Sequence, residues 1–230
     1  RINTWSQQAG AQSPSVHTFG YDAVNQLVSA AVTNAGSLVN TFAYSYDSVA
    51  NRLTEQVGPS NHTATYNSLN QIGTSTAPGF PRTNEWDALD RLVAVTVGNQ
   101  RTEFAYDGLS RRVAIRHLVN GTEVSHRRFL WCGGQLCEER QANGLVTKRF
   151  FPQGVRIESG PEAGNYYYTR DHLGSIRELT DGDGNVRARY GYDPYGRRIK
   201  LMGDRDADFG FAGMFWSAEA QLSLTHFRAY

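Results

Sequence analysis

The sequence has few of the features that mark membrane proteins, signal-bearing precursors or disulfide-rich domains. Its two cysteines, Cys132 and Cys137, are too few for a disulfide framework in a chain of 230 residues. It has no run of 18 apolar residues, so we expect no membrane-spanning helix. The first ten residues, RINTWSQQAG, contain no hydrophobic signal segment and read as though cut from a longer chain.

Charge and metal-binding motifs are also scarce. The chain has 23 Lys and Arg against 22 Asp and Glu, a formal net charge of +1. This balance does not indicate a nucleic-acid or polyanionic partner. No glycine-rich phosphate loop is present, and the six histidines lack the spacing of metal ligands. We therefore expect no cofactor and no metal.

The residues that are abundant favour β-structure. The 23 glycines, 12 tyrosines and 11 phenylalanines occur where turn formers alternate with aromatic and β-branched runs, which is typical of strands. No helical periodicity of convincing length appears, and residues 217–221 allow at most one helical turn. We predict an all-β chain with little or no helix.

An aromatic residue followed by Asp or Asn recurs through the first half of the chain. The pairs are Tyr21-Asp22, Tyr46-Asp47, Tyr66-Asn67, Trp86-Asp87 and Tyr106-Asp107, so the steps are 25, 20, 20 and 20 residues. The Asp or Asn side chain can accept hydrogen bonds from backbone N–H groups two residues on and so opens a turn. An aliphatic residue such as Leu92 then starts the next strand.

One such repeat supplies two strands and two turns and cannot bury its apolar face alone. Stacked repeats can, so the pattern predicts a long antiparallel β-sheet that coils on itself into part of a shell or solenoid. We expect the aromatic residue of each pair to pack into the core. The aspartates would form a ladder along the sheet, one per repeat, and would not converge as a catalytic pair.

Residues 166–198 form a second block in which strand-forming runs also alternate with turn-forming residues. Residues 181–185, DGDGN, break the chain where a hairpin reverses, and Val186–Tyr192 alternates as a strand. The next residues, Asp193-Pro194-Tyr195-Gly196, have turn chemistry. An EF-hand reading of the DGDGN segment fails, because its sixth and twelfth positions are Val186 and Tyr192.

This block closely resembles the core-associated segment of the Rhs/YD-repeat proteins. The family pattern is DHLGS-[VI]-R-x-[LV]-T-D-x-x-G, followed by Y-x-Y-D-[PA]-[FY]-G-R. The matching residues are Asp171, His172, Leu173, Gly174, Ser175, Arg177, Thr180, Asp181, Gly184, Tyr190, Tyr192, Asp193, Pro194, Tyr195, Gly196 and Arg197. A second family pattern matches Phe209, Phe211, Ala212, Gly213, Leu222, Arg228 and Tyr230.

The resemblance implies three regions and a structural role. Residues 1–113 would be degenerate YD repeats of about 20 residues, residues 114–165 irregular β-hairpin repeats, and residues 166–230 the core-associated segment, truncated before its Asp-Pro motifs. In relatives such as polymorphic toxins, the C component of insecticidal Tc toxins and the teneurins, YD repeats spiral into a hollow shell. In the bacterial relatives this shell encloses a C-terminal toxic domain.

The family also implies what this chain would lack. The core-associated segment of relatives acts as an aspartyl autoprotease, and its acidic residues would follow Tyr230; Arg228 is the position that matches an arginine taking part in relatives. The resemblance thus implies a non-enzymatic fragment of a shell, secreted or exported from a bacterium. Its partners would be the toxin domain or the remaining shell, and open strand edges would allow self-association.

Two other functions stay open at this point. One is a carbohydrate- or cell-surface-binding module that uses Tyr and Trp platforms. The other is an incomplete half of the aspartyl autoprotease.

Smaller clusters have structural interpretations. In Asp171-His172 we expect a turn-supporting Asp and a partly buried His. The arginine pairs at 111–112, 127–128 and 197–198 are expected on solvated strand faces, and residues 203–208 in an exposed loop. Cys132 and Cys137 could face each other across a Gly-Gly hairpin and form a disulfide, or remain small apolar residues.

Overall fold

A computed structural model describes residues 1–8, 11–76 and 81–225. The chain divides into two compact units, Arg1–Asn84 and Glu85–Tyr230. The boundary between the units is set by the contacts within each part of the chain, and it does not coincide with a boundary between sequence motifs. The three regions drawn from the sequence, 1–113, 114–165 and 166–230, therefore stay a prediction.

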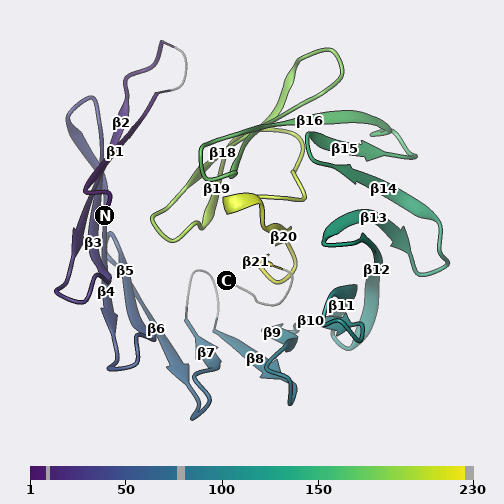
Figure 1. Ribbon diagram of the computed structural model, residues 1–230, viewed down its shortest axis with the longest axis horizontal. Helices are drawn as coiled ribbons and strands as arrows, with labels where there is room; N and C mark the ends of the chain where they lie inside the picture. Colours follow the sequence, from purple (N-terminus) through teal and green to yellow (C-terminus); the bar gives the residue numbers. More distant parts are fainter. Residues whose placement is uncertain (9–10, 77–80, 226–230) are drawn as a thin grey trace. The chain divides into compact units, whose positions relative to one another are not determined.

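Within each unit, strands pair antiparallel in the order of the sequence (Figure 1). The first unit contains β1 (Thr4–Gln7), β2 (Ser15–Tyr21), β3 (Leu27–Asn34), β4 (Ser37–Tyr46), β5 (Arg52–Val57), β6 (Ser60–Tyr66), β7 (Ile72–Ser75) and the start of β8 (Arg82–Trp86). The second contains β9 (Leu92–Val97), β10 (Gln100–Tyr106), β11 (Arg112–Val119), β12 (Thr122–Cys132), β13 (Gln135–Gln141), β14 (Val146–Phe151), β15 (Gly154–Ile157), β16 (Gly164–Arg170), β17 (Ile176–Thr180), β18 (Val186–Tyr192) and β19 (Arg198–Gly203). A short hairpin, β20 (Phe215–Ser217) and β21 (Leu222–Leu224), follows a single 3₁₀ turn, η1 (Phe211–Gly213). The prediction of an all-β antiparallel fold is confirmed, and the described residues contain no α-helix.

Each repeat turn is built around one side-chain oxygen. At Asp87, Oδ1 accepts the backbone N–H groups of Leu89 (2.9 Å) and Arg91 (3.0 Å). The backbone closes the same turn, because Asp87 N donates to Arg91 O and Asp90 N donates to Asp87 O. The same set of bonds recurs at Asp22, Asp47, Asn67, Asp107, Asp171, Asp181 and Asp193.

The third residue after the Asp or Asn has a left-handed backbone. In the first half of the chain this residue is Asn25, Ala50, Asn70, Asp90 or Ser110, with φ between 59° and 72°. In the second half glycine takes the position, at Gly174, Gly184 and Gly196. Asn, Asp and above all Gly tolerate this region best. The Asn, Asp and Gly residues at most of these positions therefore fit the left-handed backbone, whereas Ala50 adopts it without this advantage.

Ring donors of Tyr46, Tyr66, Tyr106 and Trp131 link their repeats to the preceding ones. In each case the acceptor is a backbone carbonyl oxygen of the preceding repeat, six residues after the aromatic residue of that repeat. The pairs are Tyr46 Oη to Leu27 O (2.6 Å), Tyr66 Oη to Arg52 O (3.1 Å), Tyr106 Oη to Leu92 O (2.7 Å) and Trp131 Nε1 to Arg112 O (2.7 Å). The rings of Tyr21, Tyr46, Tyr66, Trp86 and Tyr106 are partly buried. Tyr46, Trp86 and Tyr106 pack against the core clusters, as expected, although none of these rings is fully buried.

Most of the buried apolar surface lies in the second unit. Its core includes Val95, Ile115, Ile176, Leu179 and Tyr190, each exposed by 2% or less. The first unit has a smaller buried cluster of Ala30, Phe42 and Tyr44. The expected exposed loop at residues 203–208 is partly wrong: Ala207 and Asp208 are buried at its end.

The turn geometry makes a direct prediction at Asp87. Asp87→Ala removes the oxygen that holds two backbone N–H groups and should lower the free energy of unfolding by about 1–2 kcal/mol. Asp87→Asn keeps an equivalent oxygen, as Asn67 does naturally, and should cost clearly less. Chemical denaturation measures both. Equal losses for the two variants would show that the oxygen does not hold the turn.

The turn aspartates also predict acid sensitivity. Burial raises the pKa of Asp87, but hydrogen bonds from Arg91 and Leu89 outweigh it, so the pKa lies below its usual 3.8. The pKa values of Asp47, Asp107 and Asp181 are lowered as well. A carboxylate whose pKa is lower in the folded than in the unfolded chain stabilises the fold above its unfolded-state pKa. This stabilisation is lost as the pH falls through the folded-state pKa.

We therefore expect the denaturation midpoint to fall steadily below about pH 4, the usual range of aspartate titration. Replacing Asp87 and Asp107 together by Asn should flatten part of this fall, because amides do not titrate. An unchanged pH profile in the double variant would contradict the assignment.

Candidate functional site

The C-terminal segment packs against the inner face of the second unit's sheet. In Figure 1 the yellow segment with β20 and β21 lies on the concave side of the strands β11 to β18. The ring of Phe215 meets that of Phe129 edge-on at 5.4 Å, and Phe209 meets Phe150 in the same way at 5.4 Å. Phe215 is 3% exposed. The segment therefore completes the core of this unit.

Polar contacts also tie this segment to the sheet. Lys148 Nζ donates to Asp208 Oδ1 at 2.5 Å, and Arg127 Nη2 donates to Glu219 Oε2 at 2.8 Å. Burial would lower the pKa of Lys148, but attraction to Asp208 outweighs it and raises that pKa. Both ion pairs join residues far apart in the sequence, so they fix where the segment lies.

The DHLGS motif forms one of the turns and meets the C-terminal segment. Asp171 accepts N–H groups from Leu173 and Ser175, and its Oδ2 accepts Arg177 Nε at 2.9 Å. Ser175 is fully buried, and its Oγ accepts the backbone N–H of Ala212 at 3.0 Å. His172 is exposed, so the expectation of a partly buried His is wrong.

The DPYGR motif forms a neighbouring turn with a close backbone approach. Asp193 Oδ1 accepts the N–H groups of Tyr195 and Arg197. Gly196 has φ +81°, and a Cβ placed there would lie 2.3 Å from the ring of Phe211. Only glycine meets both requirements. Asp193 and Asp171 thus act as turn acceptors, and no two aspartates of the motifs share a site.

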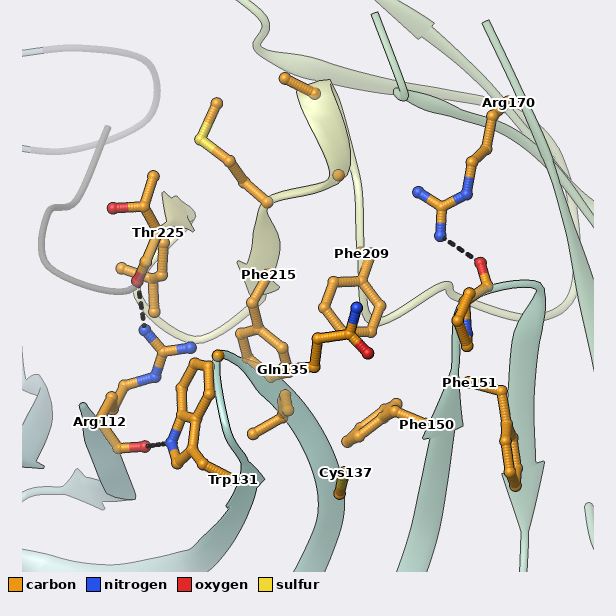
Figure 2. A pocket seen from close by; sticks show the side chains of 17 residues that line it. Arg112, Trp131, Gln135, Cys137, Phe150, Phe151, Arg170, Phe209, Phe215 and Thr225 are labelled. Carbon is orange, nitrogen blue, oxygen red and sulfur yellow. Dashed lines mark hydrogen bonds between the residues drawn. The ribbon is translucent and has the colours of Figure 1, made fainter.

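A cavity of about 380 Å³ lies between the C-terminal segment and strands β11 to β14 of the sheet (Figure 2). Its walls are mainly apolar and aromatic. The lining residues with large apolar side chains are Trp131, Leu136, Phe150, Phe151, Phe209, Met214, Phe215 and Leu224. Two arginines, Arg112 and Arg170, also line it.

Arg112, like Arg198 with its 7% exposed side chain, does not lie on the solvated strand face that the sequence predicts. It was expected on a solvated strand face with its neighbour Arg111, yet it is 2% exposed. Its position is six residues after Tyr106, where other repeats carry Leu27, Arg52, Ile72 and Leu92. The repeat register was thus the signal that could have identified an inward-facing arginine.

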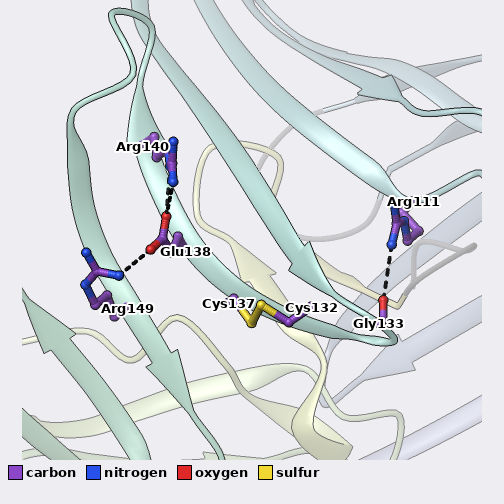
Figure 3. Close-up of a disulfide and its surroundings, with 7 residues drawn as sticks. All are labelled: Arg111, Cys132, Gly133, Cys137, Glu138, Arg140 and Arg149. Atoms are coloured by element: carbon purple, nitrogen blue, oxygen red, sulfur yellow. Dashed lines mark hydrogen bonds and ion pairs between the residues drawn. A yellow bond between two sulfur atoms is a disulfide. The ribbon is translucent and has the colours of Figure 1, made fainter.

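Cys132 and Cys137 form a disulfide across the Gly133-Gly134 turn of β12 and β13 (Figure 3). Their Cα atoms are 5.8 Å apart. Beside it, the buried Glu138 is paired with both Arg140 and Arg149, and Arg111 Nη1 donates to Gly133 O at 3.2 Å. The hairpin is therefore crosslinked and bordered by ion pairs.

Among residues 1–8, 11–76 and 81–225, no group of three or more His, Cys, Asp or Glu side chains is arranged to hold a metal ion. Nor does the described part of the chain contain a helix long and apolar enough to cross a membrane. Arg228, the position matched to the autoprotease arginine, lies outside the described residues.

No protein-family model matches the chain. The sequence is 27% identical to the tRNA3(Ser)-specific nuclease WapA of Bacillus spizizenii, over 91% of this chain and 10% of that protein. It is 26% identical to the double-stranded DNA deaminase toxin A of Burkholderia cenocepacia, over 63% of this chain and 12% of that protein. The chain thus spans about a tenth of the length of these relatives.

A solved structure of the TcdB2-TccC3 complex is also similar. The match covers 94% of this chain and 17% of that chain, with 14% sequence identity and a TM-score of 0.47. The relatives include a nuclease and a deaminase toxin, so the sequence comparisons support, in outline, the resemblance to toxin-associated Rhs proteins.

The disulfide predicts a redox-dependent stability. The bridge closes a short loop, since its cysteines are five residues apart. Removing it should lower the free energy of unfolding by about 2 kcal/mol in the loop-entropy model. The double variant Cys132→Ser/Cys137→Ser should unfold at a lower denaturant concentration than the oxidised chain and should not respond to reductant. Equal midpoints would show that the bridge contributes nothing.

Proposed function

We propose that this chain is a structural segment of an Rhs-type shell in a longer bacterial, exported protein, and that the shell encloses a C-terminal toxic domain. The observation that carries the proposal is the repeated turn. The first Asp of each turn motif accepts hydrogen bonds from backbone N–H groups, as at Asp87 and Asp171. Side chains that could do acid–base chemistry are thereby occupied in holding the sheet.

The coupling between repeats supports the same proposal. The Tyr and Trp donors bond to the backbone of the preceding repeat, so each repeat positions the next one. Such nearest-neighbour coupling suits an extended array of repeats. It also argues against a sugar-binding role, because a platform for stacking needs a free ring face and an available polar end.

A row of exposed aliphatic side chains offers further support. The second residue after the turn Asp or Asn is an exposed aliphatic residue in each of the first five repeats: Val24, Val49, Leu69, Leu89 and Leu109. Leu89 and Leu109 are 68% and 69% exposed. Within the second unit, the turns of Leu89 and Leu109 are two strand spacings apart, about 10 Å. Contiguous exposed apolar patches mark contact surfaces, and a further turn of shell would be the partner that covers these side chains.

The shell role predicts that the 230-residue chain has no catalytic activity. Incubation with tRNA or with double-stranded DNA, the substrates named for the relatives, should give neither cleavage nor deamination. Turnover that co-purifies with the folded chain and disappears when it is unfolded would contradict a purely structural role.

The exposed row predicts self-association of the isolated chain. Leu89→Lys/Leu109→Lys should shift the chain toward monomer in light scattering across a concentration series, because charges disrupt an apolar contact. Val124→Lys/Leu145→Lys is the matched control, since both residues are similarly exposed but lie outside the row. A wild-type chain that stays monomeric, or two double variants that behave alike, would contradict this surface assignment.

A further inference from the structure

Among the described residues, Arg112 is a buried cation without an acidic partner. Its side chain starts from β11 and lies against the rings of Phe215 and Phe129, with its Cζ 5.0 and 5.8 Å from their centroids. Its Nη1 donates to Thr225 O over 3.4 Å, and its buried Nε has no hydrogen-bond partner. No carboxylate pairs with it in the described part of the chain.

Two neighbouring arginines, in contrast, have partners for their guanidinium groups. Arg127 is paired with Glu139 and Glu219. Arg170, which also lines the cavity, donates to Gly174 O at 3.1 Å and to Pro152 O at 2.9 Å. Of the two arginines that line the cavity, Arg112 is therefore the one with an N–H donor left without a partner. The 17 lining residues include no Asp or Glu.

A buried guanidinium without a counter-ion is costly to keep. Burial lowers the pKa of Arg112 to about 10, so the group remains charged near neutral pH. Residues 226–230, HFRAY, contain no acidic side chain. A counter-ion from a side chain of this chain would have to come from elsewhere, yet the nearby acids Glu139 and Glu219 already pair with Arg127.

We propose that this cavity binds a carboxylate carried by an apolar peptide segment. Arg112 would donate to the carboxylate, the pairing that a guanidinium forms best. Trp131, Phe209 and Leu224 would cover the apolar flanks. Figure 2 shows the Arg112 side chain beside Trp131, facing Thr225 and Phe215. The cavity has the size of a site for a few side chains.

A phosphate is the less suitable anion. It carries more charge than a carboxylate near neutral pH, so transferring it between aromatic walls costs more free energy of desolvation. Arg112 alone would balance one negative charge. This site goes beyond the shell role, because it would bind the segment whether or not the chain is part of a larger shell.

The test is titration calorimetry of the 230-residue chain with the probe peptide acetyl-Leu-Asp-Leu-amide. We expect saturable binding that weakens at least tenfold for acetyl-Leu-Asn-Leu-amide and is lost in Arg112→Met. Arg156→Met is the matched control, because Arg156 is exposed and pairs with Glu158 outside the cavity; it should bind as the wild type does. Equal affinity for the Asp and Asn peptides would overturn the proposal.

Two further measurements keep the test decisive. Arg112→Met should remain folded, since it removes an unpaired buried charge; if it does not, Leu136→Trp keeps Arg112 but fills the cavity and should abolish binding. In the wild type, the Nε–H NMR signal of Arg112 should shift on addition of the Asp peptide but not of the Asn peptide. A stronger response to inorganic phosphate than to the Asp peptide, or no shift with either, would contradict a carboxylate site.

Discussion

A single side-chain oxygen that accepts two backbone N–H groups is the interaction on which this structure depends. In the turn at Asp87 it fixes the N–H groups of Leu89 and Arg91 while Asp90 adopts a left-handed backbone. The strands on either side then pair with an irregularity next to the aromatic residue, as between Ala105 and Tyr106. The same irregularity occurs between Ser45 and Tyr46 and between Thr65 and Tyr66. Because such bulges increase the local twist of a sheet, a regular series of them would bend the sheet at every repeat.

The turns also explain how the second unit accommodates its C-terminal segment. The turns at Asp171 and Asp193 present Ser175 and Gly196 to that segment, one as a buried acceptor and one as space for the ring of Phe211. Aromatic contacts through Phe209 and Phe215 then extend the apolar core. In the Asp171-His172 pair, which looks catalytic in the sequence, Asp171 accepts the N–H groups that hold the turn and His172 is exposed. Polar chemistry remains available at Arg112, a cation buried among rings that has no carboxylate partner in the part of the chain that the structure describes.

The sequence alone predicts the period, the all-β class and the use of Asp in turns, because these depend on local spacing and on side chains two to four residues from the backbone groups they bind. It does not predict contacts that join distant segments. The burial of Asp208 against Lys148 and the role of Ser175 need the C-terminal segment to be folded onto the sheet. Arg112 falls between these cases. The repeat register places it at the position of Leu92, but charged residues usually lie on the surface, so the sequence favours the wrong location.

Amide hydrogen exchange by NMR tests the central claim most directly, since it compares neighbouring N–H groups in one turn. The N–H of Leu89 is bonded to Asp87 Oδ1 although the Leu89 side chain is 68% exposed, and the structure gives the N–H of Ala88 no such bond. We expect Leu89 and Arg91 to exchange at least about tenfold more slowly than Ala88, and Leu109 and Arg111 to do so relative to Gly108. Equal, fast exchange of all these amides in the folded chain would contradict the claim that the turn oxygen organises the sheet.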